Sequence, residues 1–399
     1  MTFRGVDFYN LDELLTDEER LVRNSVREFM EKEVVPLVVD SWHKEEPLDF
    51  RELAPKMGEL GMLGPFIPEE YGGVGANYIE FGLICQEVER VDSALRSFVA
   101  VTSGLVMYPI WQFGSEEQKQ KYLPKLAKGK IIGCFGMTEP NYGSDPGSME
   151  TSAKRDGDEW ILNGSKTWIT EADIADIAIV WARDVEDKKI KGFIVEKGTK
   201  GFSQHALIKK GSMRAGGVGE LGFVNCRVPE ENRLPKAIGL KPGLSCLDQA
   251  RYSISWGSIG AAMDCYETAL NYAKERKQFG IPIAGFQLVQ EKLVKMLIEI
   301  TKGQLLCWRL GKLMDAGKAT PEQISLAKKN NVRVARYCAR TAREILGANG
   351  VSLDYSPIRH MANIESVYTY EGTDDIHTLI LGRAITGIQA FRRDIVVKE

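Results

Sequence analysis

The chain has 399 residues, of which 44% are hydrophobic and 27% are charged, enough to bury a large core in two or three structural units. Its net charge of -3 provides no basic excess for nucleic acid or an anionic membrane, so we expect neither partner. No apolar run approaches the length of a membrane span. The N-terminus also lacks the basic stretch and apolar run of a signal peptide.

Cysteine and histidine give no indication of a metal. The seven cysteines are scattered and form no Cys-x-x-Cys pair, so we expect reduced thiols and a cytoplasmic location. The four histidines show no spacing that would place two of them on one helix face as zinc or iron ligands. We expect no metal site.

The first third of the sequence has a helical pattern. Apolar residues recur at helical spacing over residues 16–35, where Thr16 and Glu19 form a capping box and Pro36 ends the run. The glycines of residues 72–75 favour a plain turn, because neither a P-loop lysine nor a preceding strand accompanies them. Further helices are expected over residues 50–63, 78–91, 95–113 and 116–126.

The period changes between Ser152 and Pro235. Short β-rich runs alternate there with turns, one of which is expected at Asn163-Gly164. This stretch predicts a small all-β module.

Long helical patterns return after Pro242. They cover residues 247–277, 286–316 and 321–346, and a last helix ends near Phe391. Small residues between Ala250 and Ala262 would let partner helices approach closely. We predict an α+β, mostly α, fold with an N-terminal helical domain (1–134), a middle β domain (135–240) and a C-terminal four-helix bundle (241–399).

Three segments resemble the acyl-CoA dehydrogenase family of flavoproteins. They are Phe135-Gly-Met-Thr-Glu-Pro-Asn-Tyr-Gly-Ser-Asp, Asn163-Gly-Ser-Lys-Thr-Trp-Ile-Thr and Tyr370-Glu-Gly-Thr-Asp-Asp-Ile. The resemblance spans nearly the whole chain, and the fold of that family has the domain order predicted above. It implies a bound FAD, an acyl-CoA substrate, electron transfer to electron-transferring flavoprotein, and a homotetramer.

Glu371 matches the catalytic base of the family. Such a base takes the α proton of the acyl group while the flavin accepts a hydride from the β carbon. The resemblance implies that the Glu371 N–H also binds the thioester oxygen, where it would stabilise enolate charge. Without the surrounding motif, a glutamate before a glycine is most often an ordinary turn carboxylate.

The resemblance implies two sets of flavin-binding residues. The first set lies in and between the first two motifs, where Trp168 would cover one face of the ring: Phe135, Met137, Thr138, Gly143, Ser144, Trp168, Ile169 and Thr170. The second set binds the flavin nucleotide, in part across a subunit interface: Arg276, Phe279, Gln287, Glu344, Leu346, Gly347, Ala348, Thr373 and Phe391. Taken alone, Trp168 is also consistent with a sheet core, and Arg276 with a basic helix end.

The segment Glu89-Arg-Val-Asp-Ser resembles the glutaryl-CoA dehydrogenases within the family. Arg96 matches the residue that holds the distal carboxylate of glutaryl-CoA, with Glu89 two turns earlier on the same predicted helical stretch as its ion-pair partner. A routine helix salt bridge is the alternative. The substrate-binding residues implied are Glu89, Arg96, Ser97, Ser144, Leu244, Arg251, Tyr370 and Gly372. The expected reaction is desaturation of glutaryl-CoA followed by decarboxylation to crotonyl-CoA.

Three residues depart from the family pattern. Ala100 stands where serine is expected, Glu171 where asparagine is usual, and Asp374 where a histidine is usual. The two carboxylates would repel a second anionic group of the substrate unless they face solvent. Three other functions stay open: a dehydrogenase of another short-chain, cyclic or dicarboxylic acyl-CoA without decarboxylation, an oxidase that uses oxygen, and a non-catalytic binding protein.

Overall fold

The structure is a computed structural model that describes residues 7–207 and 209–390. Its N-terminal helix α1 (Asp17–Phe29) begins at the predicted capping box, which is confirmed. The Thr16 hydroxyl accepts the Glu19 N–H at 3.1 Å, and the Glu19 carboxylate accepts the Thr16 N–H at 2.9 Å. The helices that follow are α2 (Val35–Lys44), α3 (Phe50–Glu59), α4 (Tyr78–Val91), α5 (Ser93–Ala100), α6 (Tyr108–Phe113) and α7 (Glu116–Ala127).

Pro36 does not end the first helical run, so that expectation was wrong. A π-helical turn (Met30–Val34) leads from α1 directly into α2, and Pro36 occupies the first turn of α2. The π-helical turn interrupts the regular hydrogen-bond ladder at this point, which is where a helix can accommodate a residue that lacks an N–H.

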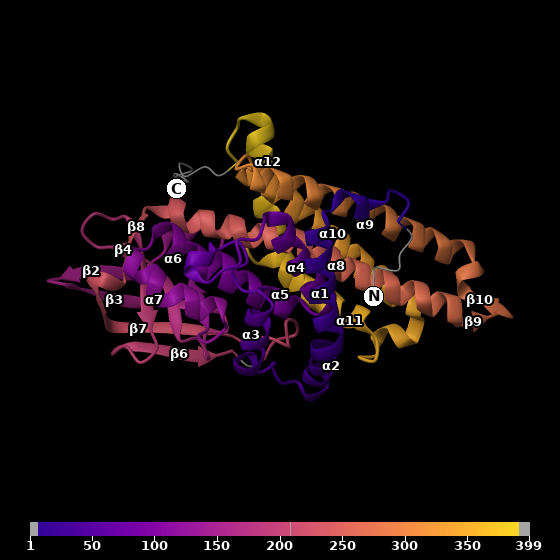
Figure 1. Ribbon diagram of the computed structural model, residues 1–399, viewed down its shortest axis with the longest axis horizontal. Helices are drawn as coiled ribbons and strands as arrows, with labels where there is room; N and C mark the ends of the chain where they lie inside the picture. The colour runs from indigo at the N-terminus through magenta and orange to yellow at the C-terminus, as the bar shows by residue number, and fades with distance from the viewer. Residues whose placement is uncertain (1–6, 208, 391–399) are drawn as a thin grey trace, which may run out of the picture.

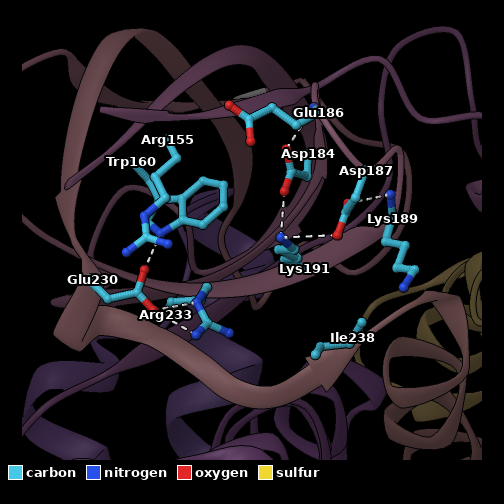
Figure 2. A pocket seen from close by; sticks show the side chains of 10 residues that line it. All are labelled: Arg155, Trp160, Asp184, Glu186, Asp187, Lys189, Lys191, Glu230, Arg233 and Ile238. Atoms are coloured by element: carbon cyan, nitrogen blue, oxygen red, sulfur yellow. Dashed lines mark hydrogen bonds and ion pairs between the residues drawn. The ribbon is translucent and has the colours of Figure 1, made fainter. Parts of the chain in front are cut away.

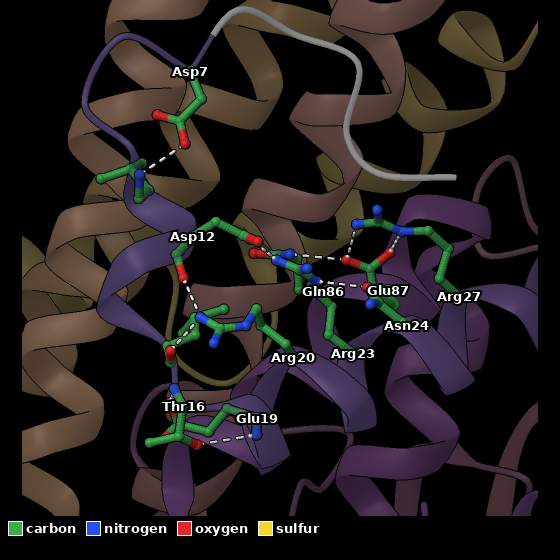
Figure 3. A network of polar contacts seen from close by, with 12 residues as sticks. Asp7, Asp12, Thr16, Glu19, Arg20, Arg23, Asn24, Arg27, Gln86 and Glu87 are labelled. Atoms are coloured by element: carbon green, nitrogen blue, oxygen red, sulfur yellow. Dashed lines mark hydrogen bonds and ion pairs between the residues drawn. The ribbon is translucent and has the colours of Figure 1, made fainter.

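A buried ion pair fastens α1 to α4. Arg27 donates from Nε and Nη2 to the two carboxylate oxygens of Glu87, each at 2.7 Å, and Gln86 Nε2 donates to Glu87 at 2.9 Å (Figure 3). Two parallel hydrogen bonds fix the relative position of the two side chains more firmly than a single contact does. Helix α4 is thereby held two residues before Glu89.

The middle of the chain forms a mixed β-sheet. Its main path has the order β6-β7-β3-β2-β4-β5-β8, and β1 pairs in parallel with β4. The strands are β1 (Gly133–Gly136), β2 (Ser152–Asp156), β3 (Glu159–Thr170), β4 (Ile177–Asp184), β5 (Ile190–Glu196), β6 (Phe202–Ala206), β7 (Val218–Pro229) and β8 (Arg233–Ile238). A separate core that includes Trp160, Phe193 and Phe223 lies within this sheet.

The predicted turn at Asn163-Gly164 is instead an irregularity inside β3. The pairing of β3 with β7 shifts in register between Leu162 and Gly164, and then continues to Thr170. Gly164 has a φ of 143°, and an added Cβ there would lie 2.6 Å from the Thr151 hydroxyl. A glycine therefore permits a bulge with close backbone approach rather than a reversal.

The C-terminal part consists of long helices. They are α8 (Leu240–Glu275), α9 (Gln287–Asp315), α10 (Pro321–Leu346), α11 (Ser356–Thr369) and α12 (Asp374–Thr386), with a small hairpin of β9 (Lys277–Gln278) and β10 (Ile281–Pro282) after α8. The single last helix expected from the sequence is thus two helices, and Phe391 lies outside the described residues. Figure 1 shows the sheet at one end of the molecule and the tips of α8 and α9 at the other.

The predicted α+β fold with helical, β and helical parts is confirmed. Strand β1 begins at Gly133 and α8 begins at Leu240, close to the expected domain limits, which themselves stay predictions. One large core of buried residues includes side chains of both helical parts, among them Val88 of α4 and Ile259 of α8.

Small residues bring α4 and α8 together. An added Cβ on Gly82 would lie 2.3 Å from the Trp256 ring, and one on Gly260 would lie 1.9 Å from the Gln86 carbonyl oxygen. One on Gly257 would lie 2.0 Å from Oε2 of Glu89. The expected close approach of a partner helix to α8 is thus confirmed, and it places Glu89 at the contact.

Among residues 7–207 and 209–390, one helical stretch, Ser93–Phe113, is long and apolar enough to cross a membrane by length and composition. The expectation that no run approaches that length was therefore wrong, because Arg96 and Ser97 interrupt the apolar residues without ending the helix. In the structure, 94% of its most apolar window is buried inside the protein, so these residues pack as core.

Candidate active site

The predicted base, Glu371, lies in a short segment between α11 and α12. Helix α11 ends at Thr369, and Thr373 begins α12 by accepting the Ile376 N–H at 3.2 Å. Glu371 adopts the left-handed conformation with φ of 55°, and Gly372 follows with φ of 89°. A non-glycine residue rarely adopts this conformation, and such strain is typical of functional segments.

Two basic side chains hold three consecutive carbonyl groups of this segment. Lys328 Nζ donates to the carbonyl oxygens of Tyr370 and Gly372, at 3.0 and 2.8 Å. Arg251 Nε donates to the carbonyl oxygen of Glu371 at 2.9 Å. Arg251 was predicted from the sequence to contact the polar part of the acyl-CoA, and the structure places it beside the base.

The carboxylate of Glu371 is suited to accept a proton. Burial raises its pKa above the usual value, although Arg251, Lys328 and Arg96 act in the opposite direction. Its Oε2 is buried and has no hydrogen-bond partner among the described residues. A carboxylate with a raised pKa is a stronger base than an exposed one, and this one is not engaged by a donor.

Arg96 links a buried carboxylate to the segment of the base. Its Nε donates to Glu89 at 2.7 Å, and its Nη2 donates to the Tyr370 hydroxyl. The exposed fraction is 1% for Arg96 and 0% for Glu89. Burial lowers the pKa of Arg96, but Glu89 and Tyr370 together more than offset this, so its pKa lies above the usual value and the guanidinium stays charged.

The ion pair does not lie within one helix, as the sequence had suggested. Glu89 belongs to α4 and Arg96 to α5, and the chain turns between them at Asp92, which caps α5 by accepting the Ala94 N–H at 2.8 Å. A helix-surface pair would be exposed, whereas this pair is enclosed between α4, α5 and α8. The routine helix salt bridge is therefore not what the structure contains.

The first set of predicted flavin residues gathers where β1 and β3 end. The Thr167 N–H donates to the Thr138 carbonyl at 2.9 Å, and the hydroxyls of Ser97 and Thr170 lie 3.5 Å apart. The end of β3, one of the segments predicted to bind flavin, thus lies beside α5, which carries Arg96.

Trp168 is not part of the sheet core. It has a φ of 60° and is 66% exposed, whereas its neighbour Ile169 is 3% exposed. A large aromatic ring held out in a left-handed conformation fits a planar flavin better than a sheet interior. Phe135 and Met137 are buried in the core, Gly143 and Ser144 lie in an exposed loop, and Leu244 is half-buried on α8.

The second set of predicted flavin residues lies elsewhere. Most of it is exposed at the end of the bundle, in the segment from the end of α8 to the start of α9 and just after α10: Arg276, Phe279, Gln287, Glu344, Gly347 and Ala348. Phe279 is 94% exposed, whereas Leu346 is buried. Figure 1 shows β9 and β10 at the end of the molecule opposite the sheet. Thr373 differs, since it begins α12 beside Glu371. The other described residues of the second set are not brought together with the first set within one chain.

Two buried residues near the base were missed by the sequence reasoning. Lys328 lies on the buried face of α10 with Ile324 and Asn331, and a lysine on an apolar helix stripe was the signal that could have found it. His377 of α12 is fully buried, and both ring nitrogens lack a partner among the described residues. Burial, then Lys328 and Arg251, lower the pKa of His377 to about 3, so its ring is neutral.

The carboxylates that depart from the family pattern do not add free negative charge. Burial raises the pKa of Glu171 to about 8, and the Gly217 N–H donates to its Oε1 at 2.8 Å. Asp374 accepts from Lys329 at 2.5 Å and from Arg333 at 2.6 and 2.8 Å. Burial alone raises the pKa of Asp374, but these ion pairs hold it below the usual value. Glu171 is thus largely neutral, and Asp374 is paired.

A hollow of about 310 Å³ lies on the β domain, away from these residues. Figure 2 shows its charged side chains engaged with one another: Lys191 with Asp184 and Asp187, and Arg233 with Glu230. A second hollow, of about 300 Å³, lies between α1, α4 and α8. Neither is lined by the predicted catalytic residue. In residues 7–207 and 209–390, no group of three or more His, Cys, Asp or Glu is placed to hold a metal ion.

Family models match nearly the whole chain. The N-terminal domain of acyl-CoA dehydrogenase matches residues 16–130, its middle domain residues 134–226, and its C-terminal domain residues 239–386. The chain therefore belongs to the acyl-CoA dehydrogenase family. It is a flavoprotein oxidoreductase that binds FAD.

Individual relatives point to two kinds of substrate. The chain is 34% identical to a glutaryl-CoA dehydrogenase of Desulfococcus multivorans, over 96% of this chain and 100% of the relative. It is 33% identical to the mitochondrial short-chain specific acyl-CoA dehydrogenase of Mus musculus, over 92% and 90%. A solved glutaryl-CoA dehydrogenase of Mycobacterium smegmatis in complex with FADH2 is 46% identical, with a TM-score of 0.94 over 96% of this chain and 98% of that one.

Proposed function

We propose that this protein oxidises glutaryl-CoA and decarboxylates it to crotonyl-CoA and carbon dioxide. The observation that carries the proposal is the buried guanidinium of Arg96, which contacts the Tyr370 hydroxyl directly before the base. A dicarboxylic acyl group needs a cation at its far end, since an unpaired carboxylate is costly to bury. A simple fatty acyl group has no distal charge with which such a cation could pair.

The side chains divide the work of dehydrogenation between them. Glu371 takes the α proton, and its backbone N–H stabilises the charge that develops on the thioester oxygen. FAD, when bound, accepts the hydride that leaves the β carbon. Arg96 holds the distal carboxylate and so fixes the register of the acyl chain relative to Glu371.

Decarboxylation then follows from the chemistry of the unsaturated product. When the bond to the distal carboxylate breaks, its electron pair enters the conjugated thioester, and carbon dioxide leaves. Glu371, which holds the proton taken earlier, returns it to the resulting carbanion. Because Glu171 is neutral and Asp374 is ion-paired, neither of these two residues cancels the positive charge of Arg96.

A second candidate is dehydrogenation of a short-chain acyl-CoA without decarboxylation. Its support is the short-chain specific relative, whose identity of 33% is close to the 34% of the glutaryl-CoA relative. Ala100, one helical turn after Arg96, also removes a hydroxyl from this side of α5. The two candidates differ in whether Arg96 is needed.

We also infer a homotetramer that passes electrons to electron-transferring flavoprotein, the acceptor that the family uses. Apolar side chains along α9 support the assembly, since Leu288, Val294 and Ile298 are 75%, 56% and 50% exposed, and contiguous exposed apolar surface is typical of an interface. The exposed second set of flavin residues would complete the site of another copy. Sedimentation of the FAD-loaded enzyme tests this assembly.

The proposed specificity is tested with Arg96→Met. We expect kcat/KM for glutaryl-CoA to fall roughly 100-fold or more, because the distal carboxylate loses its partner. For butyryl-CoA it should change less than about threefold, because that substrate has no distal charge. Steady-state kinetics with an artificial electron acceptor measures both.

The control addresses the buried charge that the substitution strands. Arg96→Met leaves Glu89 without its partner, so the double variant with Glu89→Gln removes both charges together. The double variant should show the same selective loss. If it loses activity toward glutaryl-CoA and butyryl-CoA by the same factor, Arg96 does not read the distal carboxylate and the proposal is wrong.

A further inference from the structure

Lys328 is a buried lysine whose contacts are unusual. It is 1% exposed, and its Nζ hydrogen bonds within the described part of the chain go to two backbone carbonyls, those of Tyr370 and Gly372. The other fully buried lysine, Lys166, pairs with the Glu139 carboxylate at 2.8 Å. Burying an ammonium group is costly unless it is well paired. At Lys328 the contacts with the two residues on either side of the base offset that cost only in part, since burial lowers the pKa of Lys328 to about 7.

The contact with Tyr370 has a geometric consequence. In a trans peptide unit the C=O and the following N–H are coplanar and point in opposite directions, and the chain has no cis peptide bond in its described part. The carbonyl of Tyr370 and the N–H of Glu371 belong to one such unit. Because the carbonyl points at Lys328 Nζ, the N–H of Glu371 points away from α10.

The same contact also changes the strength of that N–H as a donor. A carbonyl that accepts a hydrogen bond is polarised, most strongly when the donor is charged, and the N–H of the same peptide unit becomes more positive. Arg251 holds the next carbonyl, so the peptide on the other side of Glu371 is fixed as well. The N–H of Glu371 therefore has little freedom to rotate away from the direction that these two contacts set.

We propose that Lys328 is a positioning residue for the reaction, aiming the backbone N–H of Glu371 at the thioester oxygen and thereby setting the acidity of the α carbon. The inference rests on the proposed function only in that Glu371 removes an α proton from an acyl-CoA. It does not depend on which acyl group is bound. Lys328 itself touches neither the substrate nor the flavin.

A purely structural role would be a different account of the same contacts. Lys328 would then only tie α10 to the loop before α12, and its loss would lower stability without changing the chemistry of bound thioester. The two accounts differ in the acidity of the α carbon on the enzyme, which is measurable without turnover.

The test uses 3-thiabutyryl-CoA with the FAD-loaded enzyme. Sulfur replaces the β carbon, so the thioester can lose its α proton but cannot give up a hydride, and the resulting enolate stacked on oxidised flavin absorbs at long wavelength. A pH titration of this band reports the pKa of the α proton on the enzyme. Lys328→Met should raise that pKa by about one unit or more, a factor of 10 in the equilibrium, with thioester affinity within about threefold of wild type.

Lys329→Met is the matched control, since Lys329 is the next residue of α10 and pairs with Asp374 and Thr378 instead. It should leave the pKa of the α proton unchanged. If Lys328→Met does not fold with flavin, Lys328→Gln replaces it. Its side chain is one atom shorter and uncharged, so it cannot hold both carbonyls, and a raised pKa is again expected.

An unchanged pKa of the α proton in the folded Lys328 variant would overturn the inference alone. Absence of the long-wavelength band in the wild-type enzyme would overturn both the inference and the assignment of Glu371 as the base. A band in wild type that weakens in Lys328→Met and not in Lys329→Met supports both.

Discussion

Two glutamates and one aspartate around the site differ in charge because their surroundings differ. Glu371 has a raised pKa from burial but is faced by three basic side chains, Glu171 is buried with one backbone donor, and Asp374 is held by Lys329 and Arg333. Burial favours the neutral acid, whereas nearby cations favour the carboxylate. One chemical group, the carboxyl, is thus present here as the proposed base, as a neutral acceptor and as a structural anion.

Glu171 makes stability depend on pH in a predictable direction. Its pKa is about 8 in the folded state against 4.5 for a free glutamate, so the folded state holds a proton that the unfolded state has lost. The free energy of unfolding therefore falls as pH rises through this window, at most about 1.4 kcal/mol per pH unit. Glu171→Gln cannot titrate and should melt higher than wild type near pH 8, with a smaller difference near pH 5.

Thermal unfolding of the FAD-loaded enzyme at several pH values measures this. Lys210 and Asp173 also face Glu171, and both are retained in the variant. Asp375→Asn, which changes an exposed carboxylate of α12, serves as the control and should show no such trend. A difference in melting temperature between Glu171→Gln and wild type that does not vary with pH would refute the neutral state of Glu171.

At single residues, the sequence points to candidates where a short motif marks them. Glu371, Arg96 and Trp168 come from such motifs, and their roles stay predictions. Lys328 and His377 were missed because nothing local marks them. Their environment depends on α10, α12 and the base segment meeting in space, which residue spacing does not show.

Among the elements, the contact of α4 with α8 is the one that supports the substrate end of the site. Gly257 leaves space for the Glu89 carboxylate, since an added Cβ would lie 2.0 Å from Oε2. Gly257→Ala should therefore displace Glu89 from Arg96. We expect a loss of about 1–3 kcal/mol in stability and a lower ratio of glutaryl-CoA to butyryl-CoA activity.

Gly382→Ala is the comparison for that substitution, because Gly382 lies in α12 and its added Cβ would meet nothing within 4 Å. It should be neutral or gain up to about 1 kcal/mol. Thermal unfolding and the activity ratio are measured for both variants. An unchanged ratio in Gly257→Ala would mean that Glu89 does not need its present position.

Helix limits were predictable where caps and periodicity agree. The expected ranges 78–91 and 321–346 match α4 and α10 at both ends, and each begins at a capping box. The expectations failed at Pro36, at Gly164 and at the break between α11 and α12. At Pro36 and Gly164, packing against distant parts of the chain outweighs a local signal that predicts a break. Between α11 and α12, the same kind of packing creates a break that the local pattern does not show.

At the scale of the whole molecule, one chain presents the proposed base, the proposed cation for a distal carboxylate and one set of predicted flavin residues. Most of the second predicted set is exposed at the opposite end, which is why the proposed homotetramer matters for the site and not only for stability. Sequence motifs predicted both sets but not their separation, because separation is a property of the long helices α8, α9 and α10.

The central claim, that the site oxidises and decarboxylates glutaryl-CoA with Glu371 as base, is tested most directly by mass spectrometry of the products. Purified FAD-loaded enzyme is mixed with glutaryl-CoA and an artificial electron acceptor, alongside Glu371→Gln, which should keep its flavin but lose about 10²–10⁴-fold in rate. We predict crotonyl-CoA and carbon dioxide from the wild type. Unreacted glutaryl-CoA, in an enzyme whose flavin is bleached by another acyl-CoA, or glutaconyl-CoA as the final product, would contradict the account.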